Sequence, residues 1–482
     1  MSGTTARRRV LVPVVLLAAF LVSGGVTQAV TPFIRQDDWA FLLPEGTPGA
    51  VPPSYYNASE GRWLNSAWWW LVGQHGTTQT AALTYAVAYA LLVAGAWRVL
   101  HVAGIRPRPA VDALLGVALY ASCVWVQLLY WPGTLTPSVM WGAAALWLLP
   151  WATRRRARLA GWLAVGAAGA VLTYPPTGVV LLVLAVVALG EARWRRVGLT
   201  VVAWGVGFAA GIGVAYSLNL VLNGHFGLQL AAWRHANPLT SPAALAENVG
   251  RWLSTAGELW SAQWWVAVVA VVATAVGWRD PVVRPRLQRL LVALVVACGV
   301  DAAQTVATGL VTEARGQLWS WLAAVLPAAL LLLPREHGDD RTTPVGRGLL
   351  RRETVGAALL AVLAVGGVLA WRADLGPHQA TRAQYAAIAA AAAAHPEGTP
   401  TPTIVVYQDP TVRETRDGRL MASTLFMAVQ QERGSVPRWC VGVECRVIGE
   451  QADRASVVQL GTASDGSPLV GIVVPRPPDW LS

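Results

Sequence analysis

The chain has 482 residues, of which 55% are hydrophobic and only 13% charged, with a formal net charge of +11. Soluble domains carry about 25% charged residues, and several apolar runs here approach or exceed the roughly 20 residues that cross a bilayer as a helix. The composition therefore excludes an ordinary soluble enzyme and predicts a polytopic membrane protein. The basic residues are arginines in short loops, which orient membrane proteins, so the charge does not indicate a nucleic-acid partner.

The first apolar run, residues 10–30, follows Arg7, Arg8 and Arg9. A signal peptide has an apolar core of only about 7–15 residues. Because this run is longer, we predict an uncleaved first span with the N-terminus in the cytoplasm. A long outer loop, 31–76, then follows.

Apolar runs and arginine clusters alternate along the rest of the chain. Residues 159–190 are apolar around "TYPPTG", and proline disfavours helix in the residue before it. One long kinked helix is the alternative, but it would place the arginines of "EARWRR" outside, against the positive-inside tendency. We therefore predict two short crossings with Tyr174 at the outer turn.

A second outer loop is expected at 223–263. Eleven crossings are predicted in all: 10–30, the runs "TAALTYAVAYALLVAGAW", "AVDALLGVALYASCVWVQLLYW" and "TLTPSVMWGAAALWLLPW", the two halves of 159–190, and 197–222, 264–278, 290–312, 316–334 and 353–371.

The sequence pattern changes in the tail, 372–482. Helical patterns ("ATRAQYAAIAAAAAAH", "LMASTLFMAVQQ") alternate with short strand patterns ("TPTIVVYQD", "ASVVQLGTA", "PLVGIVVPRP"). Cys440 and Cys445 are close enough to pair, and an exported compartment permits a disulfide, whereas Cys123 and Cys298 are expected to pack inside helices. The predicted fold class is an α-helical polytopic membrane protein of about 11 transmembrane helices (1–371) with a small C-terminal extracytoplasmic α/β domain (372–482).

Charge inside the predicted spans is scarce. Asp301 is the one acid near the middle of a span; it is either part of a proton relay or hydrogen-bonded to Gln304, Thr305 or a neighbouring helix, and we favour the second interpretation. Polar residues collect instead at the outer ends of the helices. They are Arg35, Gln36, Asp37 and Asp38 after the first span, Glu60 and Arg62 later in the first loop, His225, Arg234 and His235 in the second, and Glu313 and Arg315 after residue 312.

These residue types suit a reaction between a lipid-anchored donor and an acceptor in water. A carboxylate can act as general base on an acceptor hydroxyl, and arginine can hold a lipid phosphate with forked hydrogen bonds. A second carboxylate can orient the first, raise its basicity or bind a divalent cation such as Mg²⁺ or Mn²⁺. The structural alternatives are a helix cap at Asp37 and Asp38, a surface ion pair of Glu60 with Arg62, and an interfacial anchor at Arg315.

An acidic pair just after the first span resembles the GT-C superfamily of integral-membrane glycosyltransferases. "QDDW" followed by "GRWLNSAWWWL" is most similar to the bacterial membrane glucosyltransferases that modify O-antigen, and "LTYPPTGVVLL" is similar to their tyrosine-containing helix break. The resemblance implies an inverting hexosyl- or pentosyltransferase with a polyprenyl-phosphate sugar donor. It implies that Asp37 and Asp38 are catalytic, one of them as the general base, for which we favour Asp38. It also implies that Arg35, Glu60, Arg62, Tyr174 and Arg315 bind donor or acceptor. Pro175 stands where the family pattern has glutamine, and Arg315 is placed by topology alone.

The sequence thus predicts an enzyme of the bacterial cytoplasmic membrane, with its N-terminus in the cytoplasm and its C-terminus outside. Its expected partners are the polyprenyl-phosphate sugar, a glycan, glycolipid or protein acceptor, and the bilayer. Two alternatives stay open. One is a transporter or flippase of lipid-linked sugars, and the other is a non-catalytic scaffold whose outer domain binds a partner.

Overall fold

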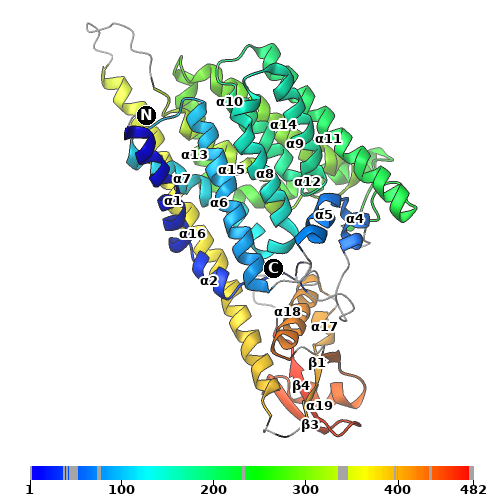
Figure 1. Ribbon diagram of the computed structural model, residues 1–482. Helices are drawn as coiled ribbons and strands as arrows, with labels where there is room; N and C mark the ends of the chain where they lie inside the picture. Colours follow the sequence, from blue (N-terminus) through cyan, green and yellow to red (C-terminus); the bar gives the residue numbers. More distant parts are fainter. Residues whose placement is uncertain are drawn as a thin grey trace.

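The computed structural model describes residues 3–35, 38, 42, 53–72, 77–230, 234–334, 346–395, 398, 400–413, 415–433 and 437–476. Within them a helical bundle stands on a small α/β domain (Figure 1). The bundle consists of α1 (Gly3–Val22), α2 (Gly25–Val30), α4 (Pro53–Glu60), α5 (Trp63–Val72), α6 (Thr78–Val102), α7 (Pro109–Tyr120), η1 (Trp125–Tyr130), α8 (Pro132–Ala152), α9 (Arg156–Val171), α10 (Pro176–Ala188), α11 (Trp194–Asn223), α12 (Pro242–Ala262), α13 (Trp264–Arg279), α14 (Arg284–Thr308), η3 (Ala314–Gly316), α15 (Trp319–Leu330) and α16 (Gly346–Ala393).

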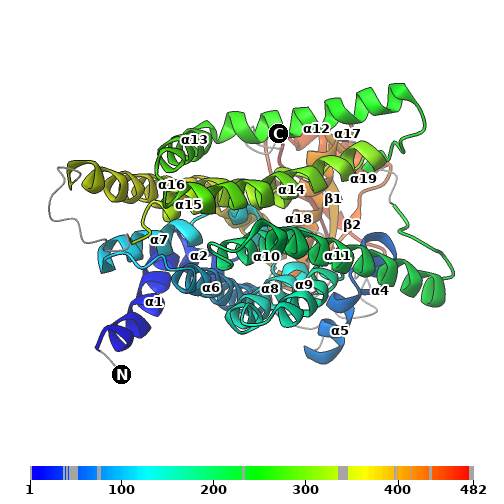
Figure 2. The same cartoon turned by 90° about the horizontal axis from the view of Figure 1, so that it is seen from above.

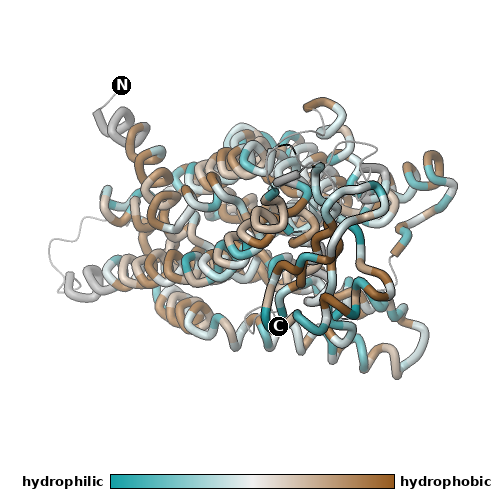
Figure 3. Tube along the Cα trace, turned by 90° about the horizontal axis from the view of Figure 1, so that it is seen from below, coloured by the Kyte–Doolittle hydropathy of each residue, from teal (hydrophilic) through white to brown (hydrophobic). Residues whose placement is uncertain are grey.

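A helix lies at every predicted crossing. Among the described residues, four helices are long and apolar enough to span a membrane, or five if the bent pair α12–α13 is one span; four shorter apolar helices accompany them. Large apolar side chains such as Val87, Val206 and Val295 are exposed on the outside of the bundle. Hydrophobic residues run along its helices in Figure 3. A helix that is apolar both inside and outside is expected in lipid, which makes this a multi-pass membrane fold.

One predicted span and one predicted loop differ in detail. The run 10–30 is not one helix, because α1 ends at Val22 and Gly24 adopts a left-handed conformation (φ 88°) before α2 begins. The second outer loop is also not irregular. Its α12 makes an angle of 87° with α13 and extends beside α14 (Figure 2). With α13 across the bilayer, α12 would lie in the plane of the membrane surface, with Leu245, Leu253 and Trp260 exposed for lipid.

The break at Pro175 and Pro176 makes a hairpin, as predicted. A Cβ added to Gly178 would lie 3.2 Å from the Ala170 side chain, and one added to Gly166 would lie 3.3 Å from Leu181. Residues pair in reverse order across the turn, so α9 and α10 run antiparallel. The arginine clusters at the two ends therefore meet: Arg196 donates to the carbonyl of Thr153 over 2.7 Å. One long kinked helix is excluded.

Other basic loops join the same end of the bundle. Arg286 donates to the carbonyl of Ala103 over 2.7 Å, and Arg289 to that of Gly190 over 3.2 Å. The buried pair Arg352–Asp280, 2.9 Å apart, fixes the first turns of α16 there. Arginines that are far apart in sequence thus share one face, which is the arrangement that the positive-inside rule expects at the cytoplasmic side.

The tail forms the predicted α/β domain. Its elements are β1 (Thr403–Tyr407), α17 (Pro410–Arg413), α18 (Arg416–Arg433), β2 (Arg438–Trp439), α19 (Val443–Gln451), β3 (Val457–Thr462) and β4 (Pro468–Val473). The strand order is β2-β1-β4-β3, with β3 antiparallel to β4 and the other pairs parallel. The boundary predicted at 371 falls inside α16, which leaves the bundle and enters the core of this domain without a break (Figure 1).

Candidate functional site

Asp38 anchors the first turn of α8. Its side chain is fully buried. Oδ2 accepts a hydrogen bond from the backbone N–H of Gly133 over 2.5 Å, and Oδ1 accepts from both the N–H and the hydroxyl of Thr134. A carboxylate in this place satisfies backbone donors that have no partner within the helix and complements the helix dipole. Asp38 therefore caps a helix, but one that begins 94 residues later, not at Trp39. Asp37 lies outside the described residues.

The second half of the first loop meets the same turn. Asn65 on α5 is buried and donates to the carbonyl of Thr134 over 2.8 Å. The N–H of Leu64 donates to the carbonyl of Leu172, just before the α9–α10 turn, over 3.0 Å. The two polar stretches of the first loop, around residues 38 and 62, thus converge on the start of α8 and on the turn that holds Tyr174.

Two predicted arginines lie against one tryptophan. The guanidinium carbon of Arg315 is 4.1 Å from the ring centre of Trp131, and that of Arg35 is 5.3 Å away. Arg315 also pairs with Glu313 over 2.5 Å. Trp131 directly precedes α8, so it brings the segment after the first span together with the turn that follows α14. This indole can orient both guanidinium groups by cation–π contact.

Tyr174 lies beside two of these arginines. The guanidinium carbon of Arg62 is 5.4 Å from the tyrosine ring centre, and Arg315 is close enough to act on the hydroxyl electrostatically. Burial raises the pKa of Tyr174, while Arg315 and Arg62 oppose part of that shift. The phenol accordingly stays protonated at neutral pH and is available as a hydrogen-bond donor.

Glu60 holds a pair of arginines. It contacts Arg62 over 2.9 Å and also forms an ion pair with Arg234 of the second outer loop. The predicted pair Glu60–Arg62 therefore exists and is extended by a third residue. Because all three side chains are mostly buried, the charges hold the first outer loop to the second more firmly than an exposed pair would.

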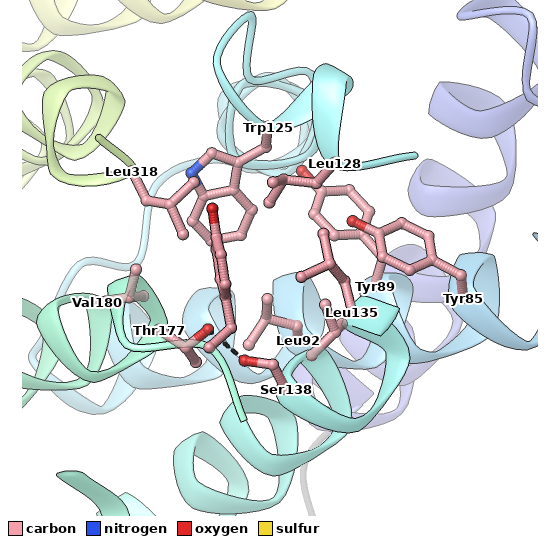
Figure 4. Close-up of a pocket in the computed structure, with 12 residues that line it drawn as sticks. Tyr85, Tyr89, Leu92, Trp125, Leu128, Leu135, Ser138, Thr177, Val180 and Leu318 are labelled. Atoms are coloured by element: carbon pink, nitrogen blue, oxygen red, sulfur yellow. Dashed lines mark hydrogen bonds between the residues drawn. The ribbon is translucent and has the colours of Figure 1, made fainter. Parts of the chain in front are cut away.

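An apolar cavity opens beneath this polar cluster. Tyr85, Leu92, Trp125, Leu135 and Tyr174 are among its lining residues, and it is narrow, with a cavity volume of about 10 Å³. Figure 4 shows its wall, including the hydrogen bond of 2.7 Å between Ser138 and Thr177. Within the described ranges, the buried hydroxyl of Tyr85 and indole N–H of Trp125 have no hydrogen-bond partner. Tyr174 belongs both to this wall and to the arginine cluster, so the two regions are continuous.

Other candidates have simpler roles. Asp301 is 6% exposed and accepts a hydrogen bond of 2.6 Å from the indole of Trp319 on α15, which is the neighbouring-helix interpretation. His225 and His235 are exposed. Cys440 and Cys445 form a disulfide bond, whereas Cys123 and Cys298 are free. In the part of the chain that the structure describes, no three His, Cys, Asp or Glu side chains are grouped so as to hold a metal ion.

Sequence reasoning missed the residues that assemble the site. Trp131 and Thr134 carry no charge, and nothing in the sequence links Arg234 of the second outer loop to Glu60 of the first. The only local signal was "WPGT", in which proline marks a helix start. Such a signal does not reveal which carboxylate will cap the helix.

No family model matches the chain, and no curated protein matches it. Among solved structures, it is similar to the crystal structure of ArnT from Cupriavidus metallidurans bound to undecaprenyl phosphate. The identity is 16%, the TM-score is 0.43, and the alignment covers 97% of this chain and 98% of that chain.

Proposed function

We propose that the protein is a membrane glycosyltransferase. It moves a sugar from a polyprenyl-phosphate donor to an envelope glycan, glycolipid or protein acceptor on the outer face of a bacterial cytoplasmic membrane. The observation that carries the proposal is the double position of Tyr174, which lines an apolar cavity and also lies beside Arg62 and Arg315. An apolar space with guanidinium groups at its edge suits a lipid phosphate, which needs both environments at once.

The reaction requires one general base and positively charged side chains around the phosphate. The acceptor hydroxyl attacks the anomeric carbon and gives its proton to a carboxylate. The bond between that carbon and the phosphate oxygen breaks, and the electron pair leaves with the phosphate. Arg62 and Arg315 stabilise the growing negative charge with forked hydrogen bonds. Attack from the side opposite the phosphate inverts the anomeric centre.

In this proposal the base is Asp37 and not Asp38, which the sequence favoured, because hydrogen bonds already occupy the Asp38 carboxylate. Three hydrogen bonds from Gly133 and Thr134 occupy the Asp38 carboxylate, and such bonds stabilise its charged form and make it a weak base. Asp37 precedes it by one peptide bond. Asp38 then serves to hold that segment of the loop against α8.

Replacing Asp37 tests the assignment. Purified protein in liposomes would receive synthetic polyprenyl-phosphate hexoses and pentoses, together with envelope glycan from a deletion strain, and release of polyprenyl phosphate would be measured. Asp37→Asn should lower the rate by about 10²- to 10⁴-fold, because asparagine cannot take the proton. The control Glu258→Gln changes an exposed acid on α12 and should leave the rate unchanged.

A comparison of bacterial strains tests sugar donors that are absent from the synthetic set used in liposomes. The deletion strain should lose one sugar linkage from its envelope, wild type should restore it, and Asp37→Asn should not. Unchanged glycan composition in the deletion strain under every growth condition would refute the proposal. EDTA treatment in the liposome assay tests the predicted divalent cation separately, since loss of turnover that Mg²⁺ or Mn²⁺ restores would show a metal requirement.

The transporter alternative gains no support from Asp301. A relay or ion path needs an acid that is accessible along a polar route. The Asp301 carboxylate instead bonds to the indole of Trp319, and a second cavity of the bundle, lined by residues such as Leu119, Leu146 and Leu184, is apolar.

A further inference from the structure

The outer part of α16 carries three polar residues at intervals of four. Asp374, His378 and Arg382 therefore lie on one face of the helix. His378 is only 5% exposed, and the other two are partly buried. A histidine, an acid and an arginine that face inward beyond the apolar part of a helix are unusual, and none of them has a place in the proposed reaction.

Each of the three contacts either residues 32–33, which lead to the acidic pair, or Tyr130, which packs beside them. The hydroxyl of Tyr130 donates to Oδ2 of Asp374. The His378 ring stacks on Tyr130 with centres 4.1 Å apart and meets the edge of Phe33 at 4.8 Å. Nε of Arg382 donates to the carbonyl of Pro32 over 2.9 Å. Successive turns of α16 thus bind residues 32–33 directly and Tyr130 beside them.

The same segment is held on its other side. The carbonyl of Tyr130 accepts the N–H of Arg35 over 2.8 Å. Gln28 bonds to both the carbonyl and the N–H of Phe33, over 2.9 and 3.2 Å. Asp38 is fixed on α8 as described. Asp37 is therefore flanked by two held points, Arg35 on Tyr130 and Asp38 on α8.

The tail domain fixes the position of α16. Tyr385, Ile388 and Ala392 of α16 are buried in the domain core together with β1, β4 and α18. From α18, Met427 packs on Ile34 and Leu42 of the first loop. The domain thus contacts the catalytic segment both directly and through α16, as the course of α16 in Figure 1 illustrates.

We propose that α16 and the tail domain form a clamp that positions the acidic segment, and that Asp374, His378 and Arg382 are positioning residues for the proposed transfer. This inference rests on the proposed function. Its physical basis is that a misplacement of about 1 Å in a reacting group can cost about 10²-fold in rate. A segment held at both ends keeps its carboxylate in place before substrate arrives.

A spin label tests the clamp without any substrate. In a Cys123→Ala, Cys298→Ala background, Gln36→Cys would carry a nitroxide, and its spectrum would be recorded in liposomes. Asp374→Asn and Tyr130→Phe each weaken the same hydrogen bond, so each should narrow the lines, and the double variant should narrow them no further. Arg372→Gln, an exposed change on the same helix, should leave the spectrum unchanged.

Turnover provides the second measurement. Asp374→Asn should lower kcat about tenfold or more, change KM for the donor less than twofold, and leave the melting temperature within a few degrees. Tyr130→Phe removes a single oxygen atom and keeps the test open if Asp374→Asn does not fold. An unchanged spectrum and unchanged kcat in both variants would overturn the clamp.

Losses of turnover that track the melting temperature would overturn the clamp as well. So would changes in line width that simply add in the double variant. The proposed function fails independently, if wild-type protein transfers no sugar in liposomes and the deletion strain keeps its glycans unchanged. A mobile label in Asp374→Asn combined with that result would leave the clamp standing and remove the proposed transfer.

Discussion

At the scale of single residues, the buried carboxylate of Asp38 stabilises both the loop and the helix. Hydrogen bonds to a charged group contribute about 1.5–3 kcal/mol each when both partners are buried. The helix start at Pro132 offers free N–H groups that only an acceptor from elsewhere can satisfy. Loss of the carboxylate would release the loop and leave those donors buried without a partner, so stability and geometry are coupled at this point.

Gly133→Ala tests this coupling. Alanine in a helix is normally more stable than glycine by about 1 kcal/mol. Here the added Cβ would lie 2.8 and 3.0 Å from the two Asp38 oxygens, so the carboxylate must leave its donors. We expect a lower melting temperature and lower turnover, measured on protein in liposomes.

The control is Gly161→Ala on α9. A Cβ added there meets nothing within 4 Å, so this change should be neutral or stabilising. A second comparison uses Asp38→Ala, in which Gly133→Ala should no longer cost stability. Equal melting temperatures for wild type and Gly133→Ala would contradict the assigned contact.

Residue type and place in the sequence selected six residues that the structure shows in contact with one another or with shared partners. Arg35 and Arg315 lie against Trp131, Asp38 caps α8, and Arg62 lies beside both Glu60 and Tyr174. Nothing local in the sequence links Asp38 to Thr134, because the two are 96 positions apart. Helix periodicity is a local signal, whereas this contact depends on how the whole bundle packs.

At the scale of elements, close helix packing depends on glycine. On α11, Gly207 and Gly211 lie against the backbone of α9 at Ala164 and Ala168. Small residues four apart let helices approach where the lipid supplies no hydrophobic driving force. Apolar runs and arginine loops predicted where these helices lie, but the contact between α9 and α11 could not be read from hydropathy, which treats every lipid-soluble face alike.

Gly207→Ala should separate α9 from α11. The new Cβ would overlap the backbone of Ala164, and backbone cannot move aside as a side chain can. Overpacking of this kind costs about 1–3 kcal/mol, so we expect a lower apparent melting temperature in detergent. Gly205→Ala, two residues away on the same helix with open space around it, should raise or maintain it. The same melting temperature in both variants would contradict the packing.

At the scale of the whole molecule, two kinds of evidence bear on orientation. One end of the bundle gathers the basic loops, as in the contacts Arg196–Thr153 and Arg286–Ala103. The other end carries the candidate site and the tail domain with its disulfide. We expect the basic end to face the cytoplasm for two unrelated physical reasons: arginine-rich loops stay on that side, and a disulfide at the other end requires an oxidising compartment.

Thiol labelling in intact spheroplasts decides the orientation. In a Cys123→Ala, Cys298→Ala background, the remaining cysteines are Cys440 and Cys445, which are joined by a disulfide bond. A membrane-impermeant maleimide should not react until an impermeant reductant is added, and should then label without lysis, because reductant and label both reach an outer domain. With the disulfide left intact, an added Arg195→Cys, in the basic loop before α11, should label only after lysis. If Cys440 and Cys445 needed lysis and Cys at 195 did not, the acidic loop would face the cytoplasm, and a reaction with an extracytoplasmic acceptor would be impossible at this site.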